Sequence, residues 1–260
     1  MTVEPAFTFA QPEWLGEVSS TNDILKGRLA SGEAIPTGYV LAARRQTRGR
    51  GRMDSEWLSS ERGDLTFSFF WLATPEQTAK PMLLGTLPMV CALGVVDFLA
   101  MPPRRIGARC KWPNDVLAGD AKICGILTEG GKTPAGGFGL VVGIGVNLHG
   151  VAGRDRMFGR ATAAIDDFVP GPFDPERLLP ELLDCLSRRV DAWRRSGFAA
   201  VRADLTAMQW GVGREVSAKT VRGRANGKVA GLGENGELLL DNEAGERFVV
   251  SSVSAIESGW

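Results

Sequence analysis

The sequence is short of the residues on which many enzymes depend, with one histidine and one tyrosine among 260 residues. The single histidine, His149, cannot supply the ligand clusters of zinc sites, and it leaves one candidate base for a Ser-His-Asp triad. The four cysteines form no CxxC pair and lie in apolar stretches, at positions 91, 110, 124 and 185. We therefore predict buried, reduced thiols in a cytoplasmic chain, and chemistry that is not centred on histidine.

Net charge is also absent, because 30 Lys and Arg balance 30 Asp and Glu. With 44% hydrophobic residues, this composition excludes a disordered polyelectrolyte and a uniformly basic nucleic-acid coat. The N-terminus has no basic segment followed by an apolar run, so no signal peptide is predicted. The longest charge-free apolar run, residues 81–96, is shorter than the ~20 residues of a membrane span and predicts a buried helix.

Capping residues and apolar spacing predict helices over residues 20–32, after Pro81, and over residues 174–197 and 198–209. Strand-like apolar runs lie at residues 39–43, 65–72, 106–111, 122–128 and 138–148. From Gly213 onward, short strands alternate with Asn-Gly and Ala-Gly turns, at residues 215–221, 228–232, 237–240 and 247–250. So many strands in so short a segment predict a small β-barrel.

The most unusual local feature is residues 44–52, which contain five arginines, two glycines and no acid. Glycines let a backbone approach a ligand closely, and guanidinium groups bind phosphate oxygens in pairs. This composition predicts an anionic, phosphate-bearing ligand. Taken alone, the segment is explained equally well as a solvated basic loop or a nonspecific RNA-binding stretch.

Two further motifs follow. Residues 111–115 (KWPND) precede Lys122 and residues 125–129 (GILTE). The Pro-Asn-Asp turn predicts that Lys111 and Lys122 lie on neighbouring strands, where two ammonium groups could converge on one anion; an ordinary hairpin with surface lysines is the alternative. Residues 143–147 (GIGVN) place two glycines in an apolar strand, which predicts close approach of a ligand or of another backbone.

In order and spacing, these motifs resemble those of the biotin protein ligases, a family that attaches biotin to carboxylase carrier domains. The resemblance rests on residues 20–22, 46–52, 57, 111–115, 122–129 and 143–147. It implies an α+β fold, with a central mixed β-sheet and flanking helices as in the class II aminoacyl-tRNA synthetase-like catalytic domain of biotin and lipoate ligases. A small C-terminal SH3-like barrel would follow, and the implied domains are residues 1–211 and 212–260.

The resemblance also implies the reaction. Biotin and ATP, with Mg²⁺, would give biotinyl-5′-AMP, and a carrier lysine would then attack this adenylate. Lys122 and Arg52 would be catalytic. The implied biotin-binding residues are Ser20, Thr21, Asn22, Gln46, Arg50, Gly51, Arg52, Trp57, Lys122 and Gly125. The implied ATP- and adenylate-binding residues are Arg50, Arg52, Lys111, Asn114, Asp115, Lys122 and Asn147.

The implied partner is the biotin carboxyl carrier domain of a carboxylase, without a membrane, and homodimers are common in the family. The segment before Ser20 is too short for a helix-turn-helix module, so we expect a ligase-only form that does not bind DNA. The resemblance implies that residues 50–52 fold over biotin and the phosphates as a lid. The chain departs from the family pattern directly after them, at residues 53–56 (MDSE), which add two acids, and we expect no phosphate contact there.

Two alternatives stand beside the biotin ligase. A lipoate or octanoyl ligase of the same superfamily is disfavoured, because the KWPND motif together with the GRGR sequence of residues 49–52 resembles the biotin ligases. An RNA-binding protein that uses the arginine segment is disfavoured because no aromatic residues are interleaved with those arginines.

Overall fold

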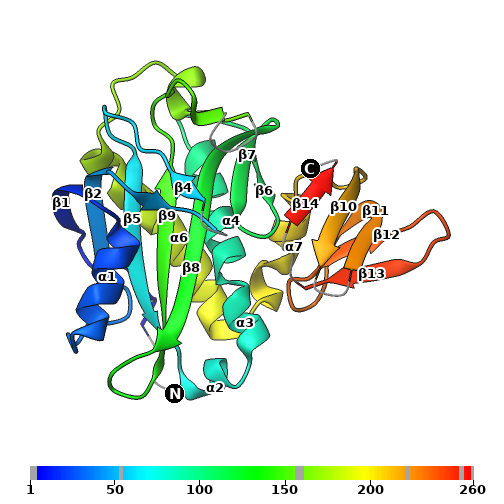
Figure 1. The fold of residues 1–260 in the computed structure, drawn as a ribbon, viewed down its shortest axis with the longest axis horizontal. Coiled ribbons are helices and arrows are strands. Elements are labelled where there is room, and N and C mark those ends of the chain that lie inside the picture. Colours follow the sequence, from blue (N-terminus) through cyan, green and yellow to red (C-terminus); the bar gives the residue numbers. More distant parts are fainter. Residues whose placement is uncertain (1–4, 53–54, 156–160, 221–222, 252–254, 259–260) are drawn as a thin grey trace.

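A seven-stranded mixed sheet forms the centre of the molecule (Figure 1). The computed structural model describes residues 5–52, 55–155, 161–220, 223–251 and 255–258. The strand order is β1-β2-β5-β9-β8-β7-β6, in which β1 and β2 are parallel and all other neighbours are antiparallel. The strands are β1 (Glu13–Val18), β2 (Val40–Gln46), β5 (Leu65–Leu72), β6 (Ala108–Lys111), β7 (Asp115–Ala118), β8 (Ala121–Lys132) and β9 (Phe138–Val146).

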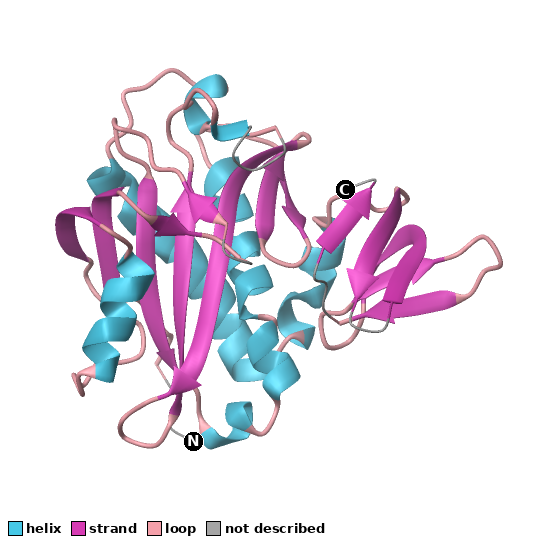
Figure 2. Cartoon of the chain, in the orientation of Figure 1, coloured by secondary structure: helices cyan, strands magenta, loops and turns pink. Residues whose placement is uncertain are grey.

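Helices cover the two faces of this sheet unequally (Figure 2). The long helices α4 (Leu87–Ala100) and α6 (Pro175–Ser196) pack on one face and enclose the main hydrophobic core. The shorter helices are α2 (Pro75–Thr78), α3 (Pro81–Gly85), η1 (Ile165–Asp167) and α7 (Ala199–Ala207), of which α3 and α7 contact α4. The opposite face carries α1 (Thr21–Ala30) over a smaller apolar cluster. Beside α1, a two-stranded hairpin of β3 (Gly49–Arg50) and β4 (Glu56–Trp57) crosses this face.

The local sequence accounts for the two long helices. The stretch Pro81–Ala100 is apolar and long enough to cross a membrane by length and composition, but 72% of its most apolar window is buried in the protein. This confirms the prediction of a core helix. In α6, Asp174 caps the helix by accepting a hydrogen bond from the backbone N–H of Glu176, Pro175 occupies the first turn, and Gly197 ends it at a φ of 71°.

The five strands predicted in the first 150 residues all exist, but four further strands of this region were not predicted. The strand β1 and the hairpin strands β3 and β4 are too short or too polar to show a clear alternation. The strand β7 begins at Asp115, inside the segment predicted as a turn. Because β7 lies between β6 and β8, Lys111 and Lys122 are on strands two positions apart, and the prediction of neighbouring strands was wrong.

The C-terminal segment forms a separate five-stranded antiparallel sheet in the order β13-β12-β11-β10-β14. Its strands are β10 (Glu215–Thr220), β11 (Gly223–Leu232), β12 (Leu238–Asp241), β13 (Arg247–Val250) and β14 (Ala255–Ser258). The predicted barrel was wrong in one respect, since among the described residues β13 and β14 do not pair and the sheet is open. Closure requires the two edge strands to share a ladder, and each here is bonded on one side only. Val221, predicted as a strand residue, lies outside the described residues.

The C-terminal sheet packs directly on the larger unit. Apolar side chains from both units belong to one buried cluster, and the indole N–H of Trp112 donates to the carbonyl of Gly236 at 2.9 Å. This hydrogen bond joins the KWPND motif to the turn between β11 and β12. The domain boundary at residues 211 and 212 stays a prediction. All four cysteines are free and buried, as predicted, and burial raises the pKa of the Cys110 thiol to about 12.

Candidate active site

Three glycines form the floor of the candidate site on the face of the sheet that carries α1. Gly125 on β8 lies opposite Gly145 on β9, and Gly143 is two residues earlier on β9. A Cβ atom at Gly143 would lie 2.3 Å from Asn22 Oδ1, and one at Gly145 would lie 2.4 Å from Trp57 Cε2. Side chains from other segments therefore occupy the space that larger residues would fill. At these two glycines the close approach is made by side chains rather than by another backbone, and approach of a ligand stays a prediction.

The N-terminus of α1 presents polar groups to this floor. Ser20 is the N-cap, and its hydroxyl accepts a hydrogen bond from the N–H of Asp23. The side-chain oxygen of Gln46 accepts from both the N–H of Thr21, at 2.7 Å, and its hydroxyl, at 3.1 Å. Ser20 and Thr21 are buried, so these hydrogen bonds fix two of the predicted biotin contacts before any ligand binds.

Two residues that the sequence reasoning did not assign to the site hold the third member of this group, Asn22. The hydroxyl of Ser68 on β5 donates to Asn22 Oδ1 at 2.6 Å, and Asn22 Nδ2 donates to the Glu129 carboxylate on β8 at 3.0 Å. Ser68 is fully buried. A serine in the otherwise apolar run around it was the available signal, because a buried hydroxyl requires a partner.

The β3–β4 hairpin brings Arg50, Arg52 and Trp57 over the same face. Trp57 lies against the glycine floor, and its ring centroid is 5.9 Å from Lys122 Nζ. Arg52 donates to Asn114 Oδ1 at 3.0 Å, and burial lowers the pKa of its guanidinium. The N–H of Gly51 closes the hairpin turn by donating to a backbone carbonyl at 2.7 Å. Met53 and Asp54 lie outside the described residues.

Lys122, three residues before Gly125 on β8, lies near the glycine floor and contacts the first residue of β7. Lys122 Nζ is 2.7 Å from Asp115 Oδ1, and both side chains are largely buried. Asp115 is also the register partner of the buried Lys111 on β6. The anion that Lys122 meets in this structure is therefore a carboxylate of the protein itself.

Two asparagines brace the backbone around Lys122. Asn147 Nδ2 donates to the carbonyls of Ala163, at 2.8 Å, and Lys122, at 3.3 Å, while its Oδ1 is buried without a hydrogen-bond partner among the described atoms. Asn114 Nδ2 donates to the carbonyl of Ile126 at 2.7 Å. The amide of Asn147 thus contacts the backbone of Lys122 and helps to fix the position of the strand that carries this lysine.

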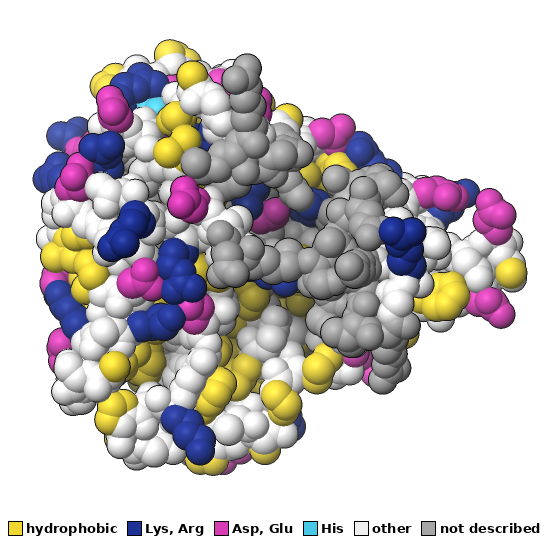
Figure 3. Space-filling model, viewed as in Figure 1, with side chains coloured by type: hydrophobic (Ala, Val, Ile, Leu, Met, Phe, Trp, Pro, Cys, Tyr) yellow, Lys and Arg dark blue, Asp and Glu magenta, His cyan; other side chains and the backbone are white. Residues whose placement is uncertain are grey.

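The arginines of residues 44–52 do not form a purely positive patch in the folded protein. Arg44 pairs with Glu176, Arg45 Nη1 is 2.7 Å from Glu17, and Arg50 Nη1 is 2.7 Å from Asp23. Figure 3 shows basic and acidic side chains interspersed on this face of the molecule. Three of the five arginines therefore face carboxylates from distant segments, and binding of a phosphate-bearing ligand by this segment stays a prediction. Arg52 donates to Asn114 of the KWPND motif.

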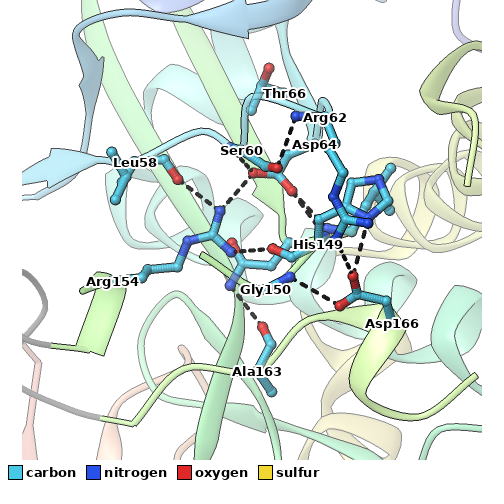
Figure 4. Close-up of polar contacts among 12 residues, drawn as sticks. Leu58, Ser60, Arg62, Asp64, Thr66, His149, Gly150, Arg154, Ala163 and Asp166 are labelled. Carbon is cyan, nitrogen blue, oxygen red and sulfur yellow. Dashed lines mark hydrogen bonds and ion pairs between the residues drawn. The ribbon is translucent and has the colours of Figure 1, made fainter. Parts of the chain in front are cut away.

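A second polar cluster surrounds the single histidine (Figure 4). Asp64 and Arg154 form a buried ion pair at 2.8 Å, and Arg154 also donates to the carbonyls of His149 and Leu58. His149 Nδ1 is 3.2 Å from the Asp166 carboxylate. These groups connect the segment after β4 to the segment after β9. The contacts of His149 are those of a structural residue, in agreement with the prediction that the chemistry is not centred on histidine.

Within the described part of the chain, no group of three or more His, Cys, Asp or Glu side chains could hold a metal ion. Two oxygen donors of this part of the site are the carboxylate of Asp115, which pairs with Lys122, and the amide oxygen of Asn114, which accepts from Arg52. Such a donor set fits Mg²⁺, which keeps several waters and binds through one or two carboxylates together with substrate phosphates.

These features define a class of protein: an α+β fold in which the polar end of a helix and two cationic side chains lie over the same face of a mixed sheet. The model of the biotin/lipoate A/B protein ligase family matches residues 15–147. The chain is 31% identical over 251 residues to the biotin--[acetyl-CoA-carboxylase] ligase of Mycobacterium tuberculosis, covering 95% of this chain and 88% of that protein. The chain belongs to the biotin/lipoate A/B protein ligase family.

Two further proteins to which the chain is similar are also named biotin ligases. A biotin--[acetyl-CoA-carboxylase] ligase of Paracoccus denitrificans is 31% identical over 82% of this chain and 88% of its own length. Among solved structures, the biotin protein ligase from Aquifex aeolicus in complex with biotin and ATP superposes with a TM-score of 0.79 and 29% identity. The superposition covers 96% of this chain and 99% of that one, so the likeness includes the open C-terminal sheet.

Proposed function

We propose that this chain is an ATP-dependent biotin protein ligase, which activates biotin as biotinyl-5′-AMP and transfers it to a lysine of a biotin carboxyl carrier protein. One observation carries the proposal: the polar N-terminus of α1, the glycine floor, and the cationic groups of Lys122 and Arg52 converge on one face of the sheet. This arrangement suits a ligand with a polar head and a carboxylate tail, held beside a nucleotide. The ligase relatives support the same assignment.

The chemistry needs charge stabilisation more than a proton carrier. When the biotin carboxylate attacks the α-phosphorus of ATP, negative charge spreads over the phosphoryl oxygens, and pyrophosphate leaves. Lys122 would exchange its contact with Asp115 for the carboxylate and the α-phosphate, and Arg52 would turn from Asn114 to the same oxygens. A site without a catalytic histidine is adequate for this reaction.

The hairpin supplies the second requirement, which is exclusion of water. An acyl adenylate hydrolyses when water reaches it, so a retained intermediate needs a cover. Trp57 and Arg52 would close over biotin and the phosphates, and Gly51 allows the tight turn between them. Thr21, Asn22 and Gln46 would hydrogen-bond the head group of biotin.

Mg²⁺ would be held by the triphosphate, water and Asp115, and it would supply further positive charge to the phosphates. The acceptor would be the carrier domain of a carboxylase, and we place the enzyme in the cytoplasm, a proposal supported by its four reduced cysteines. The expected homodimer also stays a proposal.

The decisive experiment incubates the purified chain with labelled biotin, MgATP and a carrier domain, with an active ligase as control. We expect one label on the carrier lysine, and no label when that lysine is replaced by arginine. A parallel incubation with lipoate tests the related ligase activity. Absence of label with biotin, while the control ligase labels the carrier, would overturn the assignment.

A further inference from the structure

Glu129 is contacted from three sides although neither biotin nor nucleotide binding was assigned to it. Its Oε2 accepts a hydrogen bond from Asn22 Nδ2 at 3.0 Å. Its Oε1 accepts from Lys26 Nζ at 2.7 Å and lies 3.2 Å from Arg50 Nη1. The side chain of Glu129 is 18% exposed, against 43% for Lys26 and 39% for Arg50, so the carboxylate is the inner member of each pair.

The chemistry of the position calls for a carboxylate. All three partners of Glu129 are donors, and only an ionised carboxylate offers acceptor sites without presenting a donor of its own. Burial alone would raise the pKa of this carboxyl, but the hydrogen bonds from Lys26 and Asn22 and the charges of Lys26 and Arg50 outweigh burial and lower it. Glu129 is therefore ionised at neutral pH.

Asn22 depends on this carboxylate for its orientation. Its Oδ1 accepts from the hydroxyl of Ser68, its Nδ2 donates to Glu129, and the missing Cβ of Gly143 makes room for the amide. Rotating the amide by half a turn would set Oδ1 against the carboxylate, with two acceptors facing one another. One orientation of Asn22 is thus selected before ligand arrives.

Arg50 depends on the same carboxylate from the other side. It is a residue of β3, and its guanidinium spans from Asp23 at the start of α1 to Glu129 on β8. This bridge fastens the hairpin across the site. Because Asp23 is more exposed than Glu129, the inner contact is the one less screened by water.

We propose that Glu129 is a positioning residue for the ligase reaction: it orients the Asn22 amide toward biotin and holds Arg50, and with it the hairpin, over the bound adenylate. The inference rests on the proposed function, because biotin and its adenylate are the ligands whose binding it would govern. It assigns two measurable effects to one carboxylate, one on biotin binding through Asn22 and one on adenylate retention through Arg50.

The first test replaces Glu129 by glutamine, which keeps the shape and removes the charge. In adenylate formation, Glu129→Gln should raise KM for biotin about tenfold, while kcat changes less than about threefold, since Lys122 is untouched. Preformed labelled biotinyl-5′-AMP should leave the variant about tenfold faster. A role in folding alone would lower the active fraction without changing KM.

Double variants show through which residue Glu129 produces each effect. In an Asn22→Ala background, Glu129→Gln should add less than about twofold to KM for biotin, because the residue through which it acts is gone. Arg50→Gln should accelerate adenylate release as Glu129→Gln does, and the double variant should release it no faster. If Glu129→Gln fails to fold, Arg50→Gln removes the same ion pair from the hairpin side and still tests the effect on adenylate release.

Glu17→Gln is the matched control, because it removes an exposed carboxylate paired with Arg45 of the same arginine segment and leaves the site alone. It should keep both KM and release at parental values. If the parent forms no adenylate, the proposed function itself fails. If the parent is active and folded Glu129→Gln shows parental KM for biotin and parental release, or if its effects are fully additive with Asn22→Ala, the positioning role is wrong.

Discussion

Replacing Asp64 by asparagine removes the anion from the buried polar cluster around His149 and Arg154. Asp64 Oδ2 accepts from the N–H of Ser60 at 2.7 Å and from Arg154 at 2.8 Å, and its Oδ1 accepts from the N–H groups of Leu148 at 2.8 Å and His149 at 3.4 Å (Figure 4). Both members of the ion pair are at most 1% exposed. Asparagine has one acceptor oxygen, so its NH₂ group would face donors on one side or the other.

The expected cost is large because Arg154 would keep its charge in a buried position without an anion. Removing one partner of a buried ion pair typically destabilises a protein by about 3–5 kcal/mol. In a chain of this size, each kcal/mol lowers Tm by about 2–4 °C, so Asp64→Asn should lower Tm by roughly 6–20 °C. Replacing both partners with apolar residues, Asp64→Leu with Arg154→Met, should recover part of this loss.

Thermal and urea unfolding followed by circular dichroism measure the effect. Glu17→Gln serves as reference, since its pair with Arg45 is exposed and should contribute less than about 1 kcal/mol. The reasoning would be refuted if Asp64→Asn lay within about 1 kcal/mol of the parent protein, because the four hydrogen bonds and the buried charge would then carry little stability.

Three other changes test the site and the fold. Lys122→Ala should abolish adenylate formation and leave circular dichroism unchanged; near-normal activity in the pyrophosphate-release assay would exclude its proposed role. Gly143→Ala should raise KM for biotin more than about tenfold, because the new Cβ would displace Asn22, and an unchanged KM would contradict the glycine-floor argument. Hydrogen bonds from Arg28, which has the larger effect, and from Tyr39 lower the pKa of Glu13 from 4.5 to about 2. The stabilising effect of ionised Glu13 is therefore present above about pH 4.5 and is lost as pH falls toward about 2. Glu13→Gln should therefore lower Tm at neutral pH and flatten the decline of Tm over this interval, so that variant and parent converge near pH 2. A Tm series at stepped pH would verify this, and equal Tm values at neutral pH would contradict it.

The sequence allowed prediction of those features that depend on neighbouring residues. The capping serine of α1, the proline-started α6 and the apolar strands of the central sheet all follow from local patterns. The contacts of Ser68 and Glu129 could not be predicted in this way. The Asn22–Glu129 hydrogen bond joins residues 107 positions apart, and it exists only because β8 lies two strands from β5, beneath the first turn of α1. A motif marks which residues matter, while the sheet order decides which of them meet.

The arginine segment shows the same limit for electrostatics, and its ion pairs sharpen the proposed mechanism. Five arginines around an anion would attract any polyanion, whereas three of these are already matched by Glu176, Glu17 and Asp23. Arg52 differs from these three: it is half-buried and donates to the amide oxygen of Asn114, and burial disfavours its charged form while the nearby charge of Asp115 favours it. In the proposed mechanism, a phosphate oxygen would give Arg52 a direct anionic partner when nucleotide binds. We therefore propose that Arg52 and Lys122 supply the positive charge for the nucleotide, with Lys122 held by Asp115 until a competing anion arrives.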